Sequence, residues 1–380
     1  MKRTFILAIL TIMFICTSAT EPADSIADKP KDGIIGRVIN YFSESNKKPV
    51  THKMDFSIIG GPYYSSDTKL GLGVVAAGLY STCPDDSITH VSNLSFKGKA
   101  TTSAHFEIGV EGEHAFPQNK YIINYDLNFS SIKTKYWGIG YEMDSNDDNE
   151  SEYRYLAIQG VSTFDFQIAK NLYVGPMLTI DYIDARSYQF PALWNGLPGH
   201  TFNWGIGASL RYDTRDNFTA PKKGVYIKLD QMFDWGWMGN DYPFKVNELT
   251  ACAYGPLWRG ATLAARMHWR VTWGDTPWGL MSYLGGNVTM RGYYEGRYRD
   301  KGAADICVEL RQHVWRRNGV VAWAGVGSIF PKVSDINFHE LLPNVGVGYR
   351  WEFKKNVNIR LDFGFGKHQS GFFFGINEAF

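Results

Sequence analysis

The chain has 380 residues, of which 44% are hydrophobic, 20% charged and 15% aromatic, with a formal net charge of +1 and a mean hydropathy of -0.25. The balanced charge gives no sign of a polyanionic partner such as a nucleic acid. After the first residues, no segment is continuously apolar over the ~20 residues that a membrane-spanning helix needs, which argues against a helical membrane protein.

The first residues have the order of a secretory signal peptide: a basic end, an apolar run at 5–15 and small residues before a polar one. We expect cleavage near Ala19, so that residues 1–19 are removed. Cys16 would suggest a lipoprotein, but Ile15 stands where a lipobox needs a small residue. Removal of this leader takes away two basic residues and no acid, and leaves 37 basic and 38 acidic residues.

Residues 20–53 form an N-terminal segment that we expect in the periplasm. The segment is too short for a folded domain of ordinary size, which begins near ~50 residues. Apolar residues on one face of 32–44 predict a short amphipathic helix. This helix could lie on the membrane surface or enter the lumen of a barrel, and a packed linker explains the segment equally well.

From about residue 54 to the end, apolar and polar residues alternate with period two, the pattern typical of β-strands. In 357–366, for example, Leu361 belongs to an apolar face and Asp362 to an opposite face of polar residues and glycines. We expect strands at 54–64, 69–80, 89–97, 102–114, 119–131, 153–169, 172–184, 201–212, 224–234, 247–258, 261–273, 303–315, 320–330, 342–353, 357–366 and 370–380.

The lengths of these strands favour a membrane barrel over a soluble sandwich. A strand that crosses the hydrocarbon at a tilt needs ~9–11 residues, whereas strands of soluble proteins average nearer five or six. Short turns also alternate with long links, as in bacterial outer-membrane barrels. We therefore predict an all-β fold, a transmembrane antiparallel β-barrel of about 16 strands over 54–380, in the outer membrane of a Gram-negative-type bacterium. The long links are at 132–152, 185–200, 235–246, 274–302 and 331–341.

The charged face of the predicted strands should line the lumen. The lumen-lining charged residues that we expect are Glu107, Glu111, Arg266, His268, Arg270 and Asp305. Three cysteines follow the leader, and an odd number in an exported chain does not make a disulfide framework. We therefore expect Cys83, Cys252 and Cys307 to be packing residues.

The last predicted strand carries aromatic and aliphatic residues in one phase up to the final residue. A C-terminal strand of this kind is typical of the signal by which outer-membrane barrels are recognised for insertion. The residues expected to form it are Phe372, Phe374, Ile376 and Phe380. Glu378 interrupts the run, and we expect it at the periplasmic rim, where its charge reaches water.

One long link, 274–302, contains SYLGGNVTMRGYYEGRYRDKG, with Met290, Arg291, Gly292 and Tyr293 at its centre. This segment resembles the sixth outer loop of the BamA/TamA superfamily, the surface-antigen barrels, whose V-R-G-Y/F tip folds into the barrel. DTRDNFTAPKKG at 213–224 resembles a turn of the same family. The resemblance covers 54–380, and it implies that this loop folds inward.

The resemblance also implies partners for the loop arginine. In the family this arginine pairs with acids on the inner walls of two strands, and a buried guanidinium without such a partner would be costly. Glu309 matches the first acid, and we define the loop lock as Arg291, Gly292, Tyr293 and Glu309. The second acid is missing, because Gly325 stands at its place. We therefore expect Arg291 to depend mainly on Glu309 for its ion pair. The substitutes that the sequence offers are Asp305, Glu107, Glu111 and Glu113.

Three functions remain open. The first is a BamA/TamA-like barrel without the periplasmic POTRA domains of its relatives, for which 20–53 leaves no room, assisting insertion or translocation of proteins or lipids. Its expected partners are outer-membrane lipids, the barrel-assembly machinery and periplasmic accessory proteins. The second is a diffusion channel or structural barrel. The third, an outer-membrane enzyme, is disfavoured because no spacing singles out a catalytic triad. The sequence indicates no cofactor, no metal site and no nucleic-acid partner.

Overall fold

The structure is a computed structural model, and it describes residues 55–380 apart from 66–68, 84–85, 87–88, 195, 289 and 355. The predicted signal peptide (1–19) and the predicted helix at 32–44 lie outside the described residues. Among the helices of the described part, none is long and apolar enough to cross a membrane.

Sixteen long strands make one antiparallel sheet, as the alternation predicts, so the all-β fold is confirmed. The strands are β1 (Asp55–Ser65), β2 (Lys69–Tyr80), β3 (Ser92–Thr101), β4 (Phe106–Ala115), β5 (Tyr121–Tyr136), β6 (Ser151–Ala169), β7 (Leu172–Arg186), β8 (His200–Asp213), β9 (Gly224–Asp234), β10 (Phe244–Pro256), β11 (Ala261–Gly274), β14 (Gly302–Trp315), β15 (Asn318–Phe330), β16 (Leu342–Lys354), β17 (Val357–Gly366) and β18 (Gln369–Ile376).

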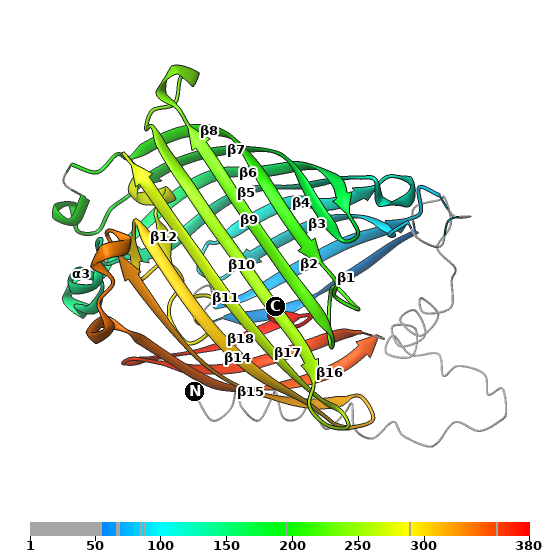
Figure 1. The fold of residues 1–380 in the computed structure, drawn as a ribbon. Coiled ribbons are helices and arrows are strands. Elements are labelled where there is room, and N and C mark those ends of the chain that lie inside the picture. Colours follow the sequence, from blue (N-terminus) through cyan, green and yellow to red (C-terminus); the bar gives the residue numbers. More distant parts are fainter. Residues whose placement is uncertain are drawn as a thin grey trace. The chain divides into compact units, whose positions relative to one another are not determined.

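Each of these strands pairs with its neighbours along the chain, and the order returns from β18 to β1 (Figure 1). That last pairing differs from the others because one register pair, Ser65 with Phe373, joins β1 to β18. By contrast, eleven pairs join β1 to β2 and eight join β17 to β18. We call this weakly paired junction the seam.

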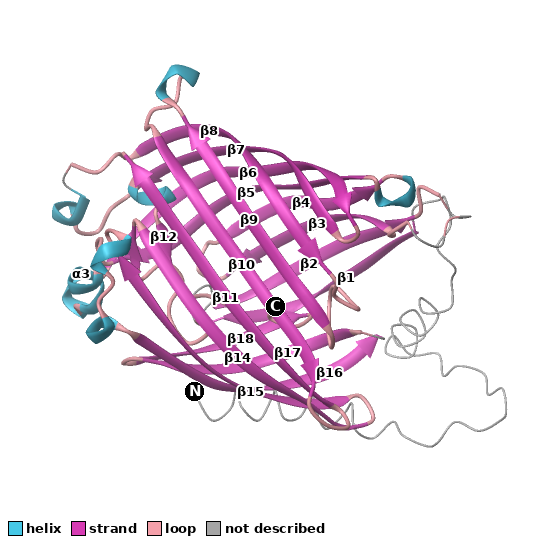
Figure 2. Cartoon of the chain, in the orientation of Figure 1, coloured by secondary structure: helices cyan, strands magenta, loops and turns pink. Residues whose placement is uncertain are grey.

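Short elements occupy the links (Figure 2). The two-residue strands β12 (Ser282–Tyr283) and β13 (Arg299–Asp300), which the alternation missed, pair inside the longest loop. The helical turns are η1 (Pro117–Asn119), α3 (Tyr141–Ser145), η2 (Asp147–Asn149), η3 (Pro191–Trp194), η4 (Gly236–Met238), η5 (Trp278–Leu280), η6 (Val333–Asp335) and η7 (Phe338–Glu340). The long loops lie at one end of the barrel, which we call the outer end (Figure 1), and β18 runs from that end toward the other.

Several predicted strands end elsewhere than expected: the one predicted at 89–97 is β3 (Ser92–Thr101), and the one predicted at 119–131 continues in β5 to Tyr136. Two further differences have a local cause. The hairpin between β3 and β4 turns at 102–105, where Ala104 has a φ of +59°, so Ala104 and His105 belong to a turn rather than to a strand. The last strand stops at Ile376, because Asn377 has a φ of +70° and leaves the extended conformation. Both departures depend on single left-handed residues, which an alternation of apolar and polar residues does not reveal.

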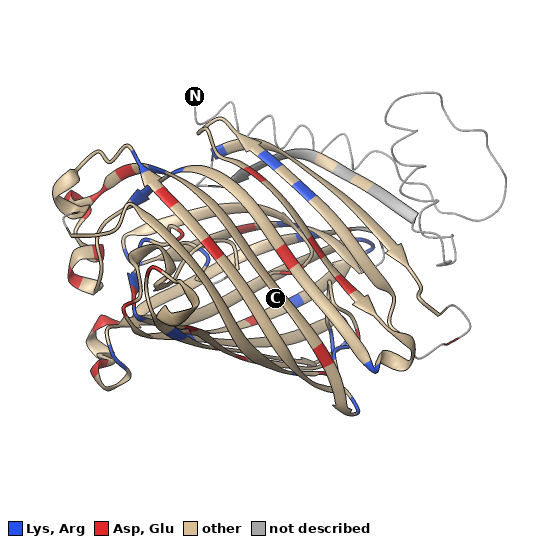
Figure 3. Ribbon diagram, turned by 90° about the horizontal axis from the view of Figure 1, so that it is seen from above, with Lys and Arg blue, Asp and Glu red and all other residues tan. Residues whose placement is uncertain are grey.

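The strands separate an apolar outer face from a polar lumen. On β14, Ile306 and Val308 are 51% and 42% exposed on the outer face, whereas Asp305 and Glu309 are buried on the inner face. Charged residues recur along the strands and gather in the loops of the outer end (Figure 3). The polar interior is what positions the site described next.

Candidate functional site

The loop between β11 and β14, residues 275–301, crosses the lumen (Figure 1). On one side its Arg291 contacts β14 and β17, and on the other its Tyr294 hydroxyl lies 3.0 Å from the hydroxyl of Thr134 on β5. Buried apolar residues of the loop pack against the strands on the first side. They are Leu284, Met290, Tyr293 and Tyr298, and their partners are Ala303, Ile329 and Leu342.

The centre of the loop is Arg291, which is 1% exposed. Its Nη1 donates to Asp362 Oδ2 at 2.6 Å, and its Nη2 donates to Glu309 Oε2. The guanidinium also lies 3.7 Å from the centre of the Trp323 ring. Two carboxylates and an aromatic face together compensate the desolvation of this cation, which would otherwise be costly.

A wider ion network surrounds this contact. Asp362 Oδ1 accepts from Arg350 Nη1 at 2.6 Å, and Glu309 Oε1 accepts from Arg311 Nε at 2.7 Å. Arg350 Nε in turn donates to Glu378 at 2.7 Å. Glu378 therefore lies inside the network with a side chain 4% exposed, and the prediction that it reaches water at the rim was wrong. The cause is the left-handed Asn377, which turns the chain inward.

Glycines allow the backbone of the loop tip to lie directly on β17. A Cβ on Gly364 would stand 2.1 Å from the carbonyl oxygen of Arg291, and a Cβ on Gly292 would stand 2.7 Å from the carbonyl carbon of Gly364. Gly292 also has a φ of +119°, which favours glycine. The amide of Asn344 on β16 donates to the same Arg291 carbonyl. Any side chain at either glycine would push the tip away from the wall.

Tyr293, the residue after Gly292, fixes the far side of the loop tip. Its hydroxyl donates to the Pro343 carbonyl at 2.7 Å and accepts from the Lys367 amide at 2.8 Å. The ring lies against Gly366, where a Cβ would meet it at 2.4 Å. The loop lock is thus one assembly in which Arg291 supplies charge, Gly292 permits close approach and Tyr293 bonds the ends of β16 and β17.

The structure brings Arg291 and Glu309 together, and it supplies a second acid from a place that sequence reasoning missed. That acid is Asp362 on β17, and Gly325 has no carboxylate to offer. The substitutes suggested from the sequence all have other partners. Asp305 pairs with Arg266, Glu107 with Lys99, Glu111 with Lys97, and Glu113 with Arg211. The alternation did place Asp362 on the inner face, which was the available signal.

The other expected lumen residues also face inward, and those on β11 and β14 form a second network with Glu248 of β10. Arg266 Nη1 donates to Asp305 at 2.8 Å, and His268 lies 3.0 Å from Glu248. Arg270 Nη1 donates to the Leu280 carbonyl at 3.0 Å, so this wall also holds the loop. Glu107 and Glu111 lie across the lumen on β4. Both networks join charges within the lumen, and no group of three or more His, Cys, Asp or Glu side chains that could hold a metal occurs in the described part of the chain.

The C-terminal residues do not continue the phase of β18. Phe372, Phe374 and Ile376 alternate with the buried Phe373, as expected, but Phe380 turns into the lumen. Its carbonyl accepts from Arg311 Nη2 at 2.8 Å, and its ring packs near the buried, free cysteines Cys252 and Cys307. The expectation that Phe380 shares the outward face of the strand was therefore wrong.

At the outer end, the loop is held by α3. Asp144 is fully buried, and its Oδ2 accepts from the Arg299 amide at 2.7 Å. Burial raises the pKa of Asp144 to about 8. Arg299 Nη1 also donates to the Trp278 carbonyl at 3.0 Å. The surrounding aromatic cluster comprises Tyr136, Tyr153, Trp194 and Trp278. The loop is thus anchored twice, in the middle of the lumen and at its outer mouth.

Comparisons with known proteins agree with this architecture. The family model described as "Omp85 superfamily domain" matches residues 93–380. A comparison with curated proteins gives no significant match.

Among solved structures, the chain is similar to BamA from Haemophilus ducreyi lacking POTRA domains 1–3, with a TM-score of 0.58 and 12% identity over 86% of this chain and 70% of that one. It is also similar to CdiB from Acinetobacter baumannii, with a TM-score of 0.54 and 13% identity over 86% of this chain and 60% of that one. For CdiB from Escherichia coli the TM-score is 0.54 and the identity 10%, over 90% and 70% of the two chains. At these identities the likeness shows the fold alone.

Proposed function

Since the chain belongs to the Omp85 superfamily of outer-membrane barrels, we propose that it assists the insertion or translocation of proteins or lipids at the outer membrane of a Gram-negative-type bacterium. Its partners in this role are outer-membrane lipids, the barrel-assembly machinery and periplasmic accessory proteins. The observation that carries the proposal is the buried loop lock, because a lumen crossed by an anchored loop is poorly suited to free diffusion.

The seam supports the same function. A strand edge with unpaired N–H and C=O groups is a template on which another strand can add. One register pair joins β1 to β18, so most backbone groups of these two edges are not engaged with each other. A client strand could pair there at little cost to the rest of the barrel, where neighbouring strands share eight or more pairs.

The loop lock lies close to this seam. Asp362 stands on β17, the strand next to β18, and in register it faces Phe373, which is the seam residue of β18. Opening of the seam would therefore act on the strand pair that carries one of the two acids of Arg291. This arrangement would let the loop hold the seam region in shape while a client enters.

The experiment that tests the proposal is assisted folding in proteoliposomes. The purified protein is reconstituted in phosphatidylethanolamine-containing vesicles, an unfolded small outer-membrane barrel is diluted onto them, and its folding is followed by heat-modifiable migration. We expect faster client folding than in protein-free vesicles. A cross-linked seam, made with Ser65→Cys and Phe373→Cys, should abolish the acceleration, and reduction of the cross-link should restore it.

A matched control is a cross-link between strands that are fully paired. Ala253→Cys and Ala265→Cys lie opposite each other on β10 and β11, which share thirteen register pairs. This cross-link should leave the acceleration unchanged. Equal client folding with and without the protein, together with porin-like conductance of the wild type in planar bilayers, would favour the diffusion channel instead.

A further inference from the structure

The lumen contains a second feature that the loop lock does not use, a cavity of about 490 Å³ between β7, β9, β10, β11 and the loop. This volume lies in the range of small-molecule sites, ~300–1,000 Å³. The cavity has one apolar side and one acidic side. The residues used below are Met177, Asp181, Met232, Asp234, Phe244 and Val246.

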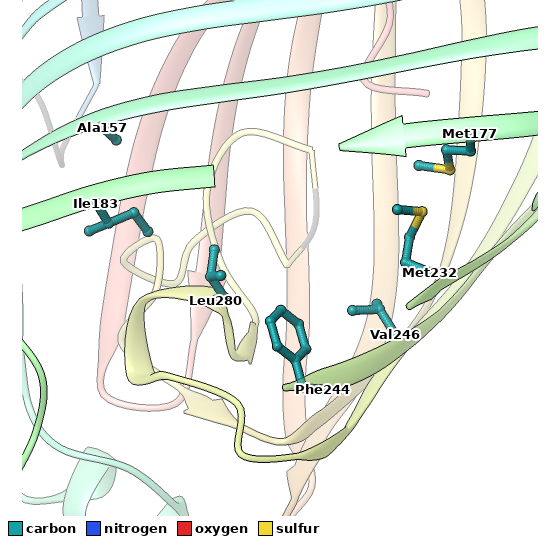
Figure 4. Packing of buried hydrophobic residues seen from close by; sticks show 7 residues of the cluster. All are labelled: Ala157, Met177, Ile183, Met232, Phe244, Val246 and Leu280. Atoms are coloured by element: carbon teal, nitrogen blue, oxygen red, sulfur yellow. The ribbon is translucent and has the colours of Figure 1, made fainter. Parts of the chain in front are cut away.

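The apolar side is unusual for a lumen wall, which in such barrels is polar. Met177, Met232, Phe244 and Val246 stand at inward positions of β7, β9 and β10 and form one buried cluster with Leu280 of the loop (Figure 4). Leu280 explains part of this cluster, because an apolar surface is needed to seat η5. The two methionines extend beyond that seat and line the open space.

Glycines of β8 make room for one of these methionines. A Cβ on Gly205 would stand 2.8 Å from the Met232 methyl carbon, and a Cβ on Gly207 would stand 2.5 Å from its sulfur. The same position on Gly205 would lie 3.1 Å from Asp234 Oδ2. The Met232 thioether and the Asp234 carboxylate therefore lie over one flat patch of wall. Methionine side chains adapt readily to apolar ligands.

The acidic side carries more negative charge than the described residues neutralise. The cations that line the cavity have other partners: Arg266 pairs with Asp305, and His268 and Arg270 lie beside Glu248. No ion pair to Asp181, Asp234 or Glu295 occurs among the residues that the structure describes. Asp234 is 3% exposed, and its Oδ1 is buried with no hydrogen-bond partner in the described part of the chain. Buried carboxylate oxygens normally have partners, so this one is available to a ligand.

We propose that this cavity is a binding site for a small amphiphilic cation, an ammonium group on a short alkyl chain. The ammonium group lies between Asp181 and Asp234, and the chain packs on Met177, Met232 and Phe244. The proposal goes beyond the function proposed above and does not depend on it. Because Leu280 and Met281 of the loop also line the cavity, an occupant would touch the loop as well as the strands.

The test uses the full chain in lipid nanodiscs, labelled with ¹³C at the methionine methyl groups, and hexylammonium as the probe, because its N–H groups can donate to the unpartnered oxygen of Asp234. We expect saturable shifts of the Met177 and Met232 signals, which Met177→Leu and Met232→Leu identify. Met267 is 37% exposed on the outer face of β11, so a shift of its signal would report partition of the probe into lipid. We expect no such shift. Hexanoate, which lacks the cation, and methylammonium, which lacks the chain, should bind at least about tenfold more weakly.

Charge-neutral variants complete the test. Asp181→Asn with Asp234→Asn should weaken binding at least about tenfold, whereas Asp126→Asn, a lumen acid on β5 outside the cavity, should change it less than twofold. Heat-modifiable migration checks that each variant folds, and Asp181→Asn alone carries the test if the double variant does not. Unshifted Met177 and Met232 signals, equal binding of hexanoate, or an unchanged affinity of the aspartate variants would each overturn the proposal.

Discussion

The two sides of the lumen differ in how completely their buried acids are paired. On the lock wall, formed by β14 to β17, Glu309 and Asp362 are fully buried and each accepts from two arginines. On the cavity wall, formed by β7 to β11, Asp181 and Asp234 have no ion-pair partner among the described residues, and methionines replace polar neighbours. The paired acids of the lock wall hold the loop in place. The unpaired acids of the cavity wall, beside an apolar surface, could bind an amphiphilic cation.

The largest effect that separates the two walls should come from reversing one carboxylate on each. Asp362→Arg would place a fourth cation beside Arg291, Arg350 and Arg360, which now surround that carboxylate. We expect this variant to lose the heat-modifiable folded form. Asp181→Arg adds a cation to a wall with surplus acid and should fold like the wild type. Normal folding of both variants would mean that the lock wall is not organised around Asp362.

This expectation reverses one that follows from alternation alone. An inward residue of a barrel should tolerate charge better than an outward one. The sequence alone therefore predicts that Asp362→Arg destabilises the barrel less than Leu361→Arg does. The structure shows why the general rule does not apply: Asp362 is 0% exposed and joins β17 to the loop, so its charge is not a solvated lumen charge.

The next largest effect should come from removing the loop arginine. Arg291→Ala removes the cation that Glu309 and Asp362 share. A buried charge left without a partner costs about 3–5 kcal/mol, and here the cost is smaller because Glu309 keeps Arg311 and Asp362 keeps Arg350. We expect larger and noisier conductance in planar bilayers as the loop loosens. Arg297→Ala is the control, because Arg297 belongs to the same loop but pairs with Asp147, whose side chain is 81% exposed.

Coupling between the partners can then be measured in a double-mutant cycle. Glu309→Ala should raise conductance as Arg291→Ala does, and the double variant should add nothing further, because both substitutions release the same loop. Asp362→Ala should behave in the same way, since the structure gives Arg291 two acids rather than one. Strictly additive effects would remove the loop lock from the account and raise the channel above the assembly function.

A smaller effect should be shared by both walls, because it concerns the lipid face. Leu361→Arg on β17 and Leu178→Arg on β7 both place a guanidinium toward the hydrocarbon, where it costs about 2–4 kcal/mol near the midplane. The free energy of unfolding, measured by urea titration in lipid vesicles, should fall by similar amounts in both. If the free energy of unfolding fell in only one of the two variants, the two walls would differ on their lipid faces as well as in the lumen.

The strands could be predicted from the sequence because their signal is local. Alternation follows from opposite faces meeting lipid and lumen, so β17 was expected at 357–366 and is found at Val357–Gly366. The partner of Arg291 was only half predictable. Glu309 followed from a resemblance, but Asp362 meets the loop through strand tilt and the depth of the tip, which no local pattern encodes. The inward turn of Phe380 and the apolar patch around Met232 likewise depend on contacts between distant strands.

The smallest effect should appear at the outer anchor of the loop, where pH provides the perturbation. Burial raises the pKa of Asp144 to about 8 while the loop 275–301 is docked on α3. Asp144 therefore keeps a proton in the docked state that it releases near the ordinary carboxyl pKa when the loop is undocked. The docked state therefore binds more protons between those two values, and its stability falls as pH rises through this window. Hydrogen exchange of residues 137–150, corrected for the intrinsic pH dependence of exchange, should show protection decreasing from pH 5 to 9.

Asp144→Asn should remove this dependence, since the amide oxygen can still accept from the Arg299 amide but carries no titrating proton. Protection in this variant should be flat across the range and should exceed that of the wild type at pH 9. Asp147 is exposed and lies three residues after Asp144, in the link between β5 and β6. Asp147→Asn should keep the wild-type dependence of protection on pH. Equal pH profiles for the wild type and Asp144→Asn would show that the outer anchor holds the loop through its aromatic cluster alone. The loop lock, whose arginine stays charged throughout this range, would then be the charged contact that decides whether the loop remains in the lumen.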